Sequence, residues 1–398
     1  MMSRWAHSLG LRLPAHHQVF AAFFLYSFSM GGFYPRLPEL QRQLELGEGA
    51  LGLALIGVAS GTLVSLTVLA PWLERVGLRR ALLSVLPGIS AAYALASFAA
   101  TPWMMFVALF LAGLAIGCVE TVVNLEADRV EHLLGRRIMN RSHAFWSFGF
   151  FSAGGLSACA SWWHWSPQMQ LLGMVPLASV ATLLLLGRFE AAPAREQNAA
   201  AAGQAAPRWA RPTPGILLLV ASCAGALLLE GAGIDWSAIY MRNIFESNAS
   251  VSALAVSTVA LAQAATRFVA DALVERWTPV PVARGLLSVL LAGAVLVAGA
   301  PQPAWAMLGF ALIGVGSSAI FPLAMSAAAQ RTDRPAAVNV AALAQTGFVI
   351  FLLAPPVLGF VAEHWGIRGA FGVGVPLVLL GLLTSHNLAP VDAKLAEK

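Results

Sequence analysis

The sequence predicts an all-α membrane protein of twelve transmembrane helices, arranged as two pseudo-symmetric six-helix bundles. Hydrophobic residues make up 58% of the 398 positions and charged residues only 11%, with a mean hydropathy of +0.74. A soluble domain carries about 25% charged residues, so this composition excludes a surface that faces water throughout. The apolar residues fall in runs near the ~20 residues with which a helix crosses ~30 Å of hydrocarbon. They do not alternate, as the ~10-residue strands of a membrane β-barrel do.

Twelve apolar runs are separated by charged residues or by proline and glycine. The first run is not followed by a cleavage site, which favours a span over a removable signal peptide. In order, the predicted spans cover residues 17–34, 50–71, 81–99, 103–126, 143–162, 168–187, 215–240, 250–270, 284–300, 303–328, 337–361 and 368–388.

The basic residues give these spans a direction. With the N-terminus inside, the inner segments hold 19 of the 24 arginines and lysines, the outer segments hold 4, and Arg267 lies within a span. This bias follows the positive-inside rule and predicts a multi-pass protein of the bacterial inner membrane with both termini in the cytoplasm. The net charge of +5 therefore reflects topology. Because the basic residues are spread over separate loops, no nucleic-acid partner is expected.

A polar, Ala- and Pro-rich stretch divides the chain. It predicts an N-terminal bundle over 14–188, a cytoplasmic linker over 189–213 and a C-terminal bundle over 214–390. The loops after spans two and eight echo each other, with Glu74-Arg75 in the first and Glu275-Arg276 in the second, 201 residues later. Parallel halves of this kind build transporters that rock about a site near the midplane.

The loop after span two carries a recognisable motif. Residues 70–80 resemble the signature Gly-x-x-x-Asp-Arg-x-Gly-Arg-Arg of the major facilitator superfamily, with Ala70 for the first Gly, Glu74 for Asp and Leu78 as an extra residue. The resemblance covers nearly the whole chain and implies the major facilitator fold. It also implies a cytoplasmic gate, in which charges latch the two halves; the alternative is a set of charges that only fix topology. The candidate gate residues are Glu74, Arg75, Arg79, Arg80, Arg267, Asp271, Glu275 and Arg276.

Within that superfamily, spans four, five and seven resemble the fucose-permease and YbjJ-type branches. Residues 117–124 are similar to the Glu-Thr-x-x-Asn stretch of the fucose permease, and 140–149 to its Asn-x-x-Gln-x-Phe-x-Ser-Phe-Gly, with His143 at the Gln position. Residues 230–237, Glu-Gly-Ala followed by Asp-Trp-Ser, resemble the YbjJ-type carriers. The first-span Asp of the fucose permease is Gly31 here, so its sugar-symport chemistry does not transfer whole.

Glu120 is the first candidate for proton and solute binding. An ionisable group within a span costs roughly 2.5–3.5 kcal/mol on insertion scales, so its presence points to function. Apolar surroundings favour the neutral form of a carboxyl group, which suits a residue that exchanges protons. Asn124 lies one turn further on the same helical face and either binds solute or satisfies Glu120.

Glu230 and Asp235 share the seventh span. Five residues correspond to about 500° of regular helix, so the two would face different directions. Gly231 and Gly233 between them weaken the helix, and a broken span would bring both carboxyl groups to one cavity. Asp235 lies nearer the outer end and is alternatively an outer-gate or capping residue.

Four further residues complete the candidate substrate and proton site. His143 opens span five and either lines the cavity or is an ordinary polar end. Gln263 and Gln345 are hydrogen-bond candidates, with interhelical polar contacts as the alternative. Trp236 is the preferred aromatic to stack on a ring-shaped solute, before Phe145, Trp146, Phe148 and Tyr34. The paired glycines 57/61 and 113/117 are more typical of close helix contacts than of ligand sites.

Several chemistries are absent from the sequence. The only lysines are Lys394 and Lys398, so no P-loop is possible. Neither a metal-ligand spacing nor a nucleophile elbow occurs, and the three cysteines lie within spans as small apolar residues. We therefore expect no enzyme, no cofactor and no metal.

The sequence favours a monomeric secondary transporter in a lipid bilayer that moves a small solute by alternating access. Protons are the first candidate for the coupling ion because of the buried carboxyl groups, and sodium is the alternative. The resemblance to the fucose permease favours uptake of a sugar-like or other polar metabolite. The missing first-span Asp permits the alternative, proton-antiport efflux of an amphipathic compound. A membrane sensor or assembly protein that does not transport is the rival of a different class.

Overall fold

The computed structural model describes residues 10–69, 76–136, 138–193 and 210–389, and these are almost entirely helical, with no strand among them. Eight segments of these ranges are helices long and apolar enough to cross a membrane. The protein is therefore an all-helical membrane protein.

The helices that precede residue 187 include both long and short elements. They are α2 (Ala15–Gly31), η1 (Tyr34–Arg36), α3 (Leu37–Gln43), α4 (Glu48–Val64), the π-helical turn η2 (Ser65–Leu69), α6 (Leu78–Ala96), α7 (Pro102–Leu134), α8 (Met139–Trp162) and α9 (Pro167–Leu186).

The helices that follow residue 213 are also of mixed length. They are α11 (Pro214–Asp235), α12 (Ser237–Phe245), α13 (Ala249–Trp277), α14 (Pro279–Gly299), α15 (Pro303–Ser317), α16 (Ile320–Ala329), α17 (Ala336–Gly372), α18 (Gly374–Thr384) and η4 (Ser385–Leu388).

Several of the long helices begin at a capping residue that the local sequence supplies. Thr101, Ser166 and Thr213 each accept a hydrogen bond from the backbone N–H three residues on, and each precedes a proline. Proline fits the first helical position because its missing N–H would have no helical partner there. Asn248 caps α13 in the same way. The Thr/Ser-Pro pairs therefore set where the apolar runs start as helices.

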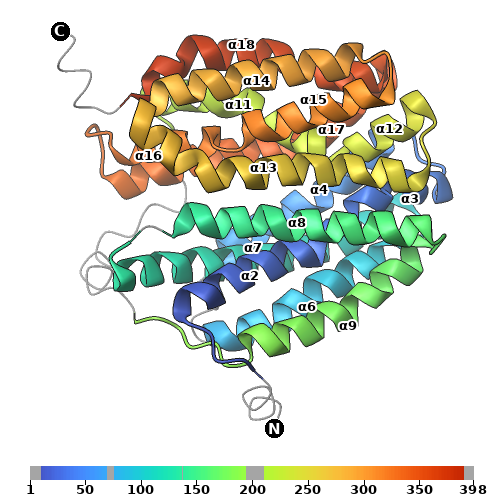
Figure 1. Cartoon of the computed structure of the whole chain (residues 1–398), viewed down its shortest axis with the longest axis horizontal. Helices are drawn as coiled ribbons and strands as arrows, with labels where there is room; N and C mark the ends of the chain where they lie inside the picture. Colours follow the sequence, from blue (N-terminus) through green and yellow to red (C-terminus); the bar gives the residue numbers. More distant parts are fainter. Residues whose placement is uncertain (1–9, 70–75, 137, 194–209, 390–398) are drawn as a thin grey trace.

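The helices gather on two sides of the molecule (Figure 1). Helices α2, α6, α7, α8 and α9 lie on one side, and α11 and α13–α18 on the other. Two helix pairs join the sides, because α8 packs along α13 and α4 packs against α17. The space between these two pairs is where a site shared by both sides has to lie.

Glycines allow α4 and α7 to pack closely. A Cβ atom on Gly57 would lie 2.5 Å from the carbonyl oxygen of Phe106, and one on Gly61 or Gly113 would overlap the facing backbone. Any larger residue would therefore force the helices apart. The prediction that these glycines mark a helix contact is confirmed.

Two predicted spans are interrupted. The seventh breaks at Trp236 between α11 and α12, and the tenth breaks at Ala319 between α15 and α16. Gly366, with φ 76°, turns α17 between the eleventh and twelfth predicted spans. The break in the seventh span was expected at Gly231 and Gly233, and that placement is wrong, since both glycines lie inside α11. Each glycine there is buried in helix packing that holds the regular conformation.

Candidate functional site

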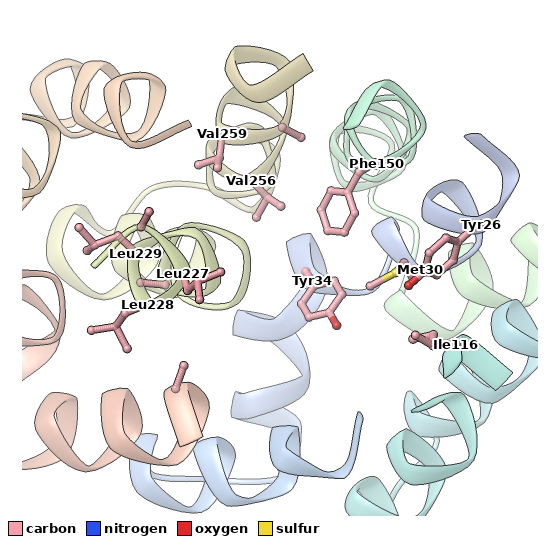
Figure 2. Close-up of a cluster of buried hydrophobic side chains, with 14 of the residues drawn as sticks. Tyr26, Met30, Tyr34, Ile116, Phe150, Leu227, Leu228, Leu229, Val256 and Val259 are labelled. Carbon is pink, nitrogen blue, oxygen red and sulfur yellow. The ribbon is translucent and has the colours of Figure 1, made fainter. Parts of the chain in front are cut away.

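A cavity of about 770 Å³ lies between the two sides of the molecule. Its walls come from α2, α4, α7, α8, α11, α16 and α17, so both sides contribute. Figure 2 shows part of this region, with Tyr26, Met30 and Tyr34 facing the side that carries Leu227 and Leu228. The polar and aromatic residues that line the cavity are Tyr26, Tyr34, Thr62, Thr67, Glu120, Trp146, Glu230, Asp235, Phe321, Gln345, Phe348 and Phe351.

Glu120 lies on α7, at the wall formed by the N-terminal side. The Asn124 side-chain amide donates a hydrogen bond to a Glu120 carboxyl oxygen at 2.9 Å and a second to the Glu120 carbonyl. The Tyr26 hydroxyl also interacts with the Glu120 carboxyl group. These contacts come from one turn of the same helix and from α2, and they hold the carboxyl group facing the cavity. No positively charged side chain pairs with it among the described residues.

Glu230 lies on the opposite wall, on α11, and is paired with a cation. Its carboxylate is 3.1 Å from Nη2 of Arg267 on α13, and both side chains are only 13% exposed. The same guanidinium donates from Nε to the Ser318 carbonyl and from Nη1 to the Ser147 hydroxyl of α8. Arg267 therefore links α11 and α13 to a helix of the N-terminal side.

Asp235 ends α11 and faces the same cavity. Within the described residues, no hydrogen bond or ion pair is made by its carboxyl group; the hydroxyls of Tyr34 and Tyr93 are close enough to feel its charge. These two hydroxyls hydrogen-bond to each other over 3.1 Å. Asp235 is thus the one cavity carboxyl group without a hydrogen-bond partner in the described part of the chain.

The two sides are fastened together at the end of the cavity near Glu48. A Cβ on Gly52 of α4 would lie 2.5 Å from the Pro355 carbonyl of α17, and one on Gly359 would lie 2.6 Å from the Glu48 carbonyl. The Glu48 carboxylate accepts a hydrogen bond from Asn243 at 3.1 Å. No solute can pass between backbones in such contact, so the cavity is closed at this end.

Comparison with known proteins decides the family. The sequence profile of the Major Facilitator Superfamily matches residues 19–351, with a second match over 237–395. The chain belongs to the Major Facilitator Superfamily. It is 26% identical over 367 residues to an uncharacterised MFS-type transporter of Yersinia pestis, covering 92% of this chain and 93% of the relative. An uncharacterised transporter of Sinorhizobium fredii is 29% identical, over 92% and 96% of the two chains.

Solved superfamily structures share the fold. The E. coli fucose:proton symporter matches with a TM-score of 0.61 at 16% identity, over 94% of this chain and 98% of that chain. The nucleoside transporter NupG matches with a TM-score of 0.65 at 15% identity, over 94% and 98%. The protein is therefore a membrane transporter of this superfamily that carries a small-molecule solute, and not an enzyme.

Four of the eight predicted site residues line the cavity between the two sides of the molecule. Glu120, Glu230, Asp235 and Gln345 all line it, from α7, α11 and α17. Glu230 and Asp235 do so although α11 is unbroken between them, because the cavity is wide enough to receive side chains from two directions of one helix. The side chain of Gln345 also accepts a hydrogen bond from the Ala210 backbone N–H at 2.9 Å.

The other four predicted site residues lie outside the cavity lining. Asn124 reaches it only through Glu120. His143 packs against the Phe23 ring at 5.1 Å, and the fully buried Gln263 donates to Ser317 at 3.3 Å. Trp236 has no exposed surface, so it does not line the cavity in this structure and its stacking on solute stays a prediction. Tyr34 and Trp146 line the cavity instead.

The predicted gate residues fall into different surroundings. Glu74 and Arg75 lie outside the described residues. Arg79 donates to the Gly187 carbonyl, Arg80 and Glu275 are exposed, and Arg276 lies 5.2 Å over the Trp277 ring. Asp271 accepts a hydrogen bond from Asn140 of α8 and thereby joins the two sides.

The sequence reasoning missed Tyr26 and the phenylalanines of the cavity. Tyr26, Met30 and Tyr34 recur at intervals of four, which places them near one face of a helix, and this period was the signal that could have found Tyr26. Phe321, Phe348 and Phe351 offered no such signal, since phenylalanine is equally common on faces that meet lipid. No cluster of metal-ligating side chains occurs in the described residues.

The Glu230–Arg267 pair yields a stability prediction. Glu230→Gln leaves the Arg267 guanidinium mostly buried without its counter-ion, which costs on the order of 3 kcal/mol of unfolding free energy. The double variant Glu230→Gln/Arg267→Gln is expected to recover part of this loss, and denaturant or thermal unfolding in detergent measures both. Asp333→Asn is the matched control, because its pair with Arg331 is 27% and 34% exposed, and should cost below about 1 kcal/mol. Equal stability of the Glu230→Gln variant and the wild type would contradict the prediction.

Proposed function

We propose that this transporter is a proton-coupled carrier that moves a small solute by alternating access, with Glu120 as the proton-exchanging group. The proposal includes twelve spans in two six-helix halves, over 14–188 and 214–390, joined by the cytoplasmic linker. It places the protein in the bacterial inner membrane with both termini in the cytoplasm.

The helix bounds support twelve spans. To the eight apolar segments, α2, α6 and α8 add three helices that run alongside them in the bundle (Figure 1). The segment Ala336–Leu388 contains the turn at Gly366, so it supplies two spans rather than one. The arginine-rich loops then lie at the end of the bundle opposite Gly52 and Gly359, which favours a cavity that opens to the cytoplasm.

One observation carries the proposal: Glu120 lies at the cavity wall, with Asn124 and Tyr26 as its polar contacts and no cation paired with it in the described part of the chain. A carboxyl group without a fixed counter-ion loses little when it takes up a proton in apolar surroundings. Glu230, by contrast, is held by Arg267 and must break an ion pair first. Glu120 is therefore the better candidate for exchange with the bulk.

Uptake of a polar metabolite is the first candidate, supported by the likeness to the fucose:proton symporter. Proton-antiport efflux of an amphipathic compound is the second, favoured by the six aromatic rings on the cavity wall. A sensor or assembly role that involves no transport has no comparable support, since the relatives named above are transporters.

The test is solute-driven proton movement in proteoliposomes. Purified protein is reconstituted around a trapped pH-sensitive dye, and a panel of sugars, nucleosides, amines and amphipathic compounds is added outside. Symport predicts proton entry together with the solute, and antiport predicts proton exit; protein-free vesicles give the background. Solute accumulation that continues unchanged when a protonophore removes the pH gradient would contradict proton coupling.

A further inference from the structure

We infer that the cavity selects positively charged solutes, namely organic cations with an apolar or aromatic body. This inference rests on the proposed function in one respect, that the cavity between the halves is the solute site. It adds the charge and chemical class of the solute, which neither the fold nor the relatives assign.

The charged residues of the cavity wall all have the same sign. Glu120, Glu230 and Asp235 line it, and no arginine, lysine or histidine does so among the described residues. A cavity with charges of one sign and low-dielectric walls concentrates ions of the opposite sign. An anionic solute would have to enter against at least one carboxylate.

Arg267, the cation paired with a carboxylate of the cavity wall, already has polar partners for all three of its nitrogens. Arg267 uses Nη2 on Glu230 at 3.1 Å, Nη1 on Ser147 at 2.6 Å and Nε on the Ser318 carbonyl at 3.0 Å. The pair with Glu230 is neutral, so Arg267 cancels one of the three carboxylates and has no nitrogen directed to an anionic solute. Two carboxyl groups remain, and Glu120 is the proposed proton site.

Asp235 is therefore the carboxyl group that we expect to pair with the charge of the solute. Its carboxyl group faces the cavity and makes no hydrogen bond or ion pair within the described chain. A carboxylate in apolar surroundings is costly unless it is paired. An ammonium group would favour the ionised form of Asp235 and pair with it directly, whereas a neutral sugar offers no counter-charge.

The remaining wall suits the body of such a cation. Tyr34 and Trp146 from the N-terminal half and Phe321, Phe348 and Phe351 from the C-terminal half line the cavity. Aromatic faces attract cations, and the attraction is stronger where the ring and the cation are shielded from water. A cavity lined by rings from both halves and by carboxyl groups offers contacts for both the ammonium group and its apolar substituents.

The test uses cysteine-reactive probes that differ in charge alone. The native Cys118, Cys159 and Cys223 are replaced by alanine, and Ala59→Cys or Ala344→Cys places a single thiol on the cavity wall. Ala336→Cys, on the exposed first residue of α17, is the reference position. Methanethiosulfonates carrying trimethylammonium-ethyl, hydroxyethyl and sulfonato-ethyl groups are reacted with the full chain in detergent, and the labelling rates are measured.

At each thiol we take the ratio of the labelling rate of the cationic reagent to that of the anionic reagent. The ratio at Ala59→Cys, divided by the ratio at Ala336→Cys, is expected to be at least about ten. The neutral reagent should label at a rate between those of the two charged reagents. Asp235→Asn should reduce the normalised ratio severalfold, and Glu120→Gln should reduce it less. Glu246→Gln, which removes an exposed carboxyl group outside the cavity, should leave it unchanged.

Equal normalised rates for the three reagents at both cavity positions, or faster labelling by the anionic one, would overturn the inference. So would an unchanged ratio in the Asp235→Asn variant. These outcomes are separate from failure of the proposed function, which is read from proton movement in proteoliposomes. If the labelling rates depend on charge but no proton movement is seen, the inference holds and the proposed function fails. If proton movement is seen but the labelling rates do not depend on charge, the proposed function holds and the inference fails.

Discussion

The Glu120→Gln variant is expected to lose pH-gradient-driven accumulation of solute, by about 100-fold or more in rate. Glutamine keeps the size of the side chain and can still accept the hydrogen bond from Asn124, so the helix and the cavity wall are preserved. It cannot take up or release a proton, and a positioned proton-transfer group contributes about 10²–10⁴-fold where transfer is required. Exchange of labelled for unlabelled solute across the membrane, which needs no net proton movement, should persist.

The measurement is uphill accumulation in proteoliposomes under an imposed pH gradient, with exchange measured in the same vesicles. Glu246→Gln makes the same chemical change at an exposed position outside the cavity and should behave as the wild type does. Uphill accumulation by the Glu120→Gln variant at the wild-type rate would remove Glu120 from the coupling mechanism. Loss of both accumulation and exchange would point to a binding role instead.

The second large effect is expected at the closed end of the cavity. In the Gly52→Ala variant the new methyl group would lie 2.5 Å from the Pro355 carbonyl oxygen, so α4 and α17 must separate. Overpacking of this kind costs about 1–3 kcal/mol, which corresponds to roughly 5–150-fold in the population of the closed conformation. We expect transport to fall about tenfold or more, and a cavity thiol at Ala59→Cys to react with impermeant reagents from the outer side.

Gly173→Ala is the matched control, because a Cβ at that helical glycine has no neighbour within 4 Å. It should leave both transport and outer accessibility at wild-type values. Wild-type transport by the Gly52→Ala variant, together with a thiol still protected from the outer side, would show that the contact is not needed for closure.

The fold was largely predictable from sequence because backbone polar groups in the lipid hydrocarbon have to be hydrogen-bonded within the chain. Apolar runs of sufficient length have to be helical, and Thr101-Pro102, Ser166-Pro167 and Thr213-Pro214 mark helix starts by local chemistry. The Glu120–Asn124 contact also follows from spacing, since residues four apart lie on one helical face. Cavity carboxyl groups were predictable for the same energetic reason, because ionisable residues within spans have to be buried in protein.

Features that depend on several helices at once were not predictable. Arg267 was assigned to the gate by its motif, and only the packing of α8, α11 and α13 shows Glu230 and Ser147 as its partners. The break at Trp236 has no local signal, as no glycine or proline occupies that position. The aromatic wall likewise arises from the way separate helices turn toward each other.

The two helix pairs that join the halves, α8–α13 and α4–α17, are in contact over different lengths. Along α8 and α13 the halves touch from Asn140–Asp271 to the hydrogen bond that Ser250 donates to the Ala158 carbonyl. That is 18 residues of α8, or about 27 Å of helix. Along α4 and α17 the closest contacts lie near Gly52 and Gly359, and the cavity comes between Leu66 and Gln345. In the proposed alternating-access cycle we therefore expect α8 and α13 to stay in contact while α4 and α17 separate.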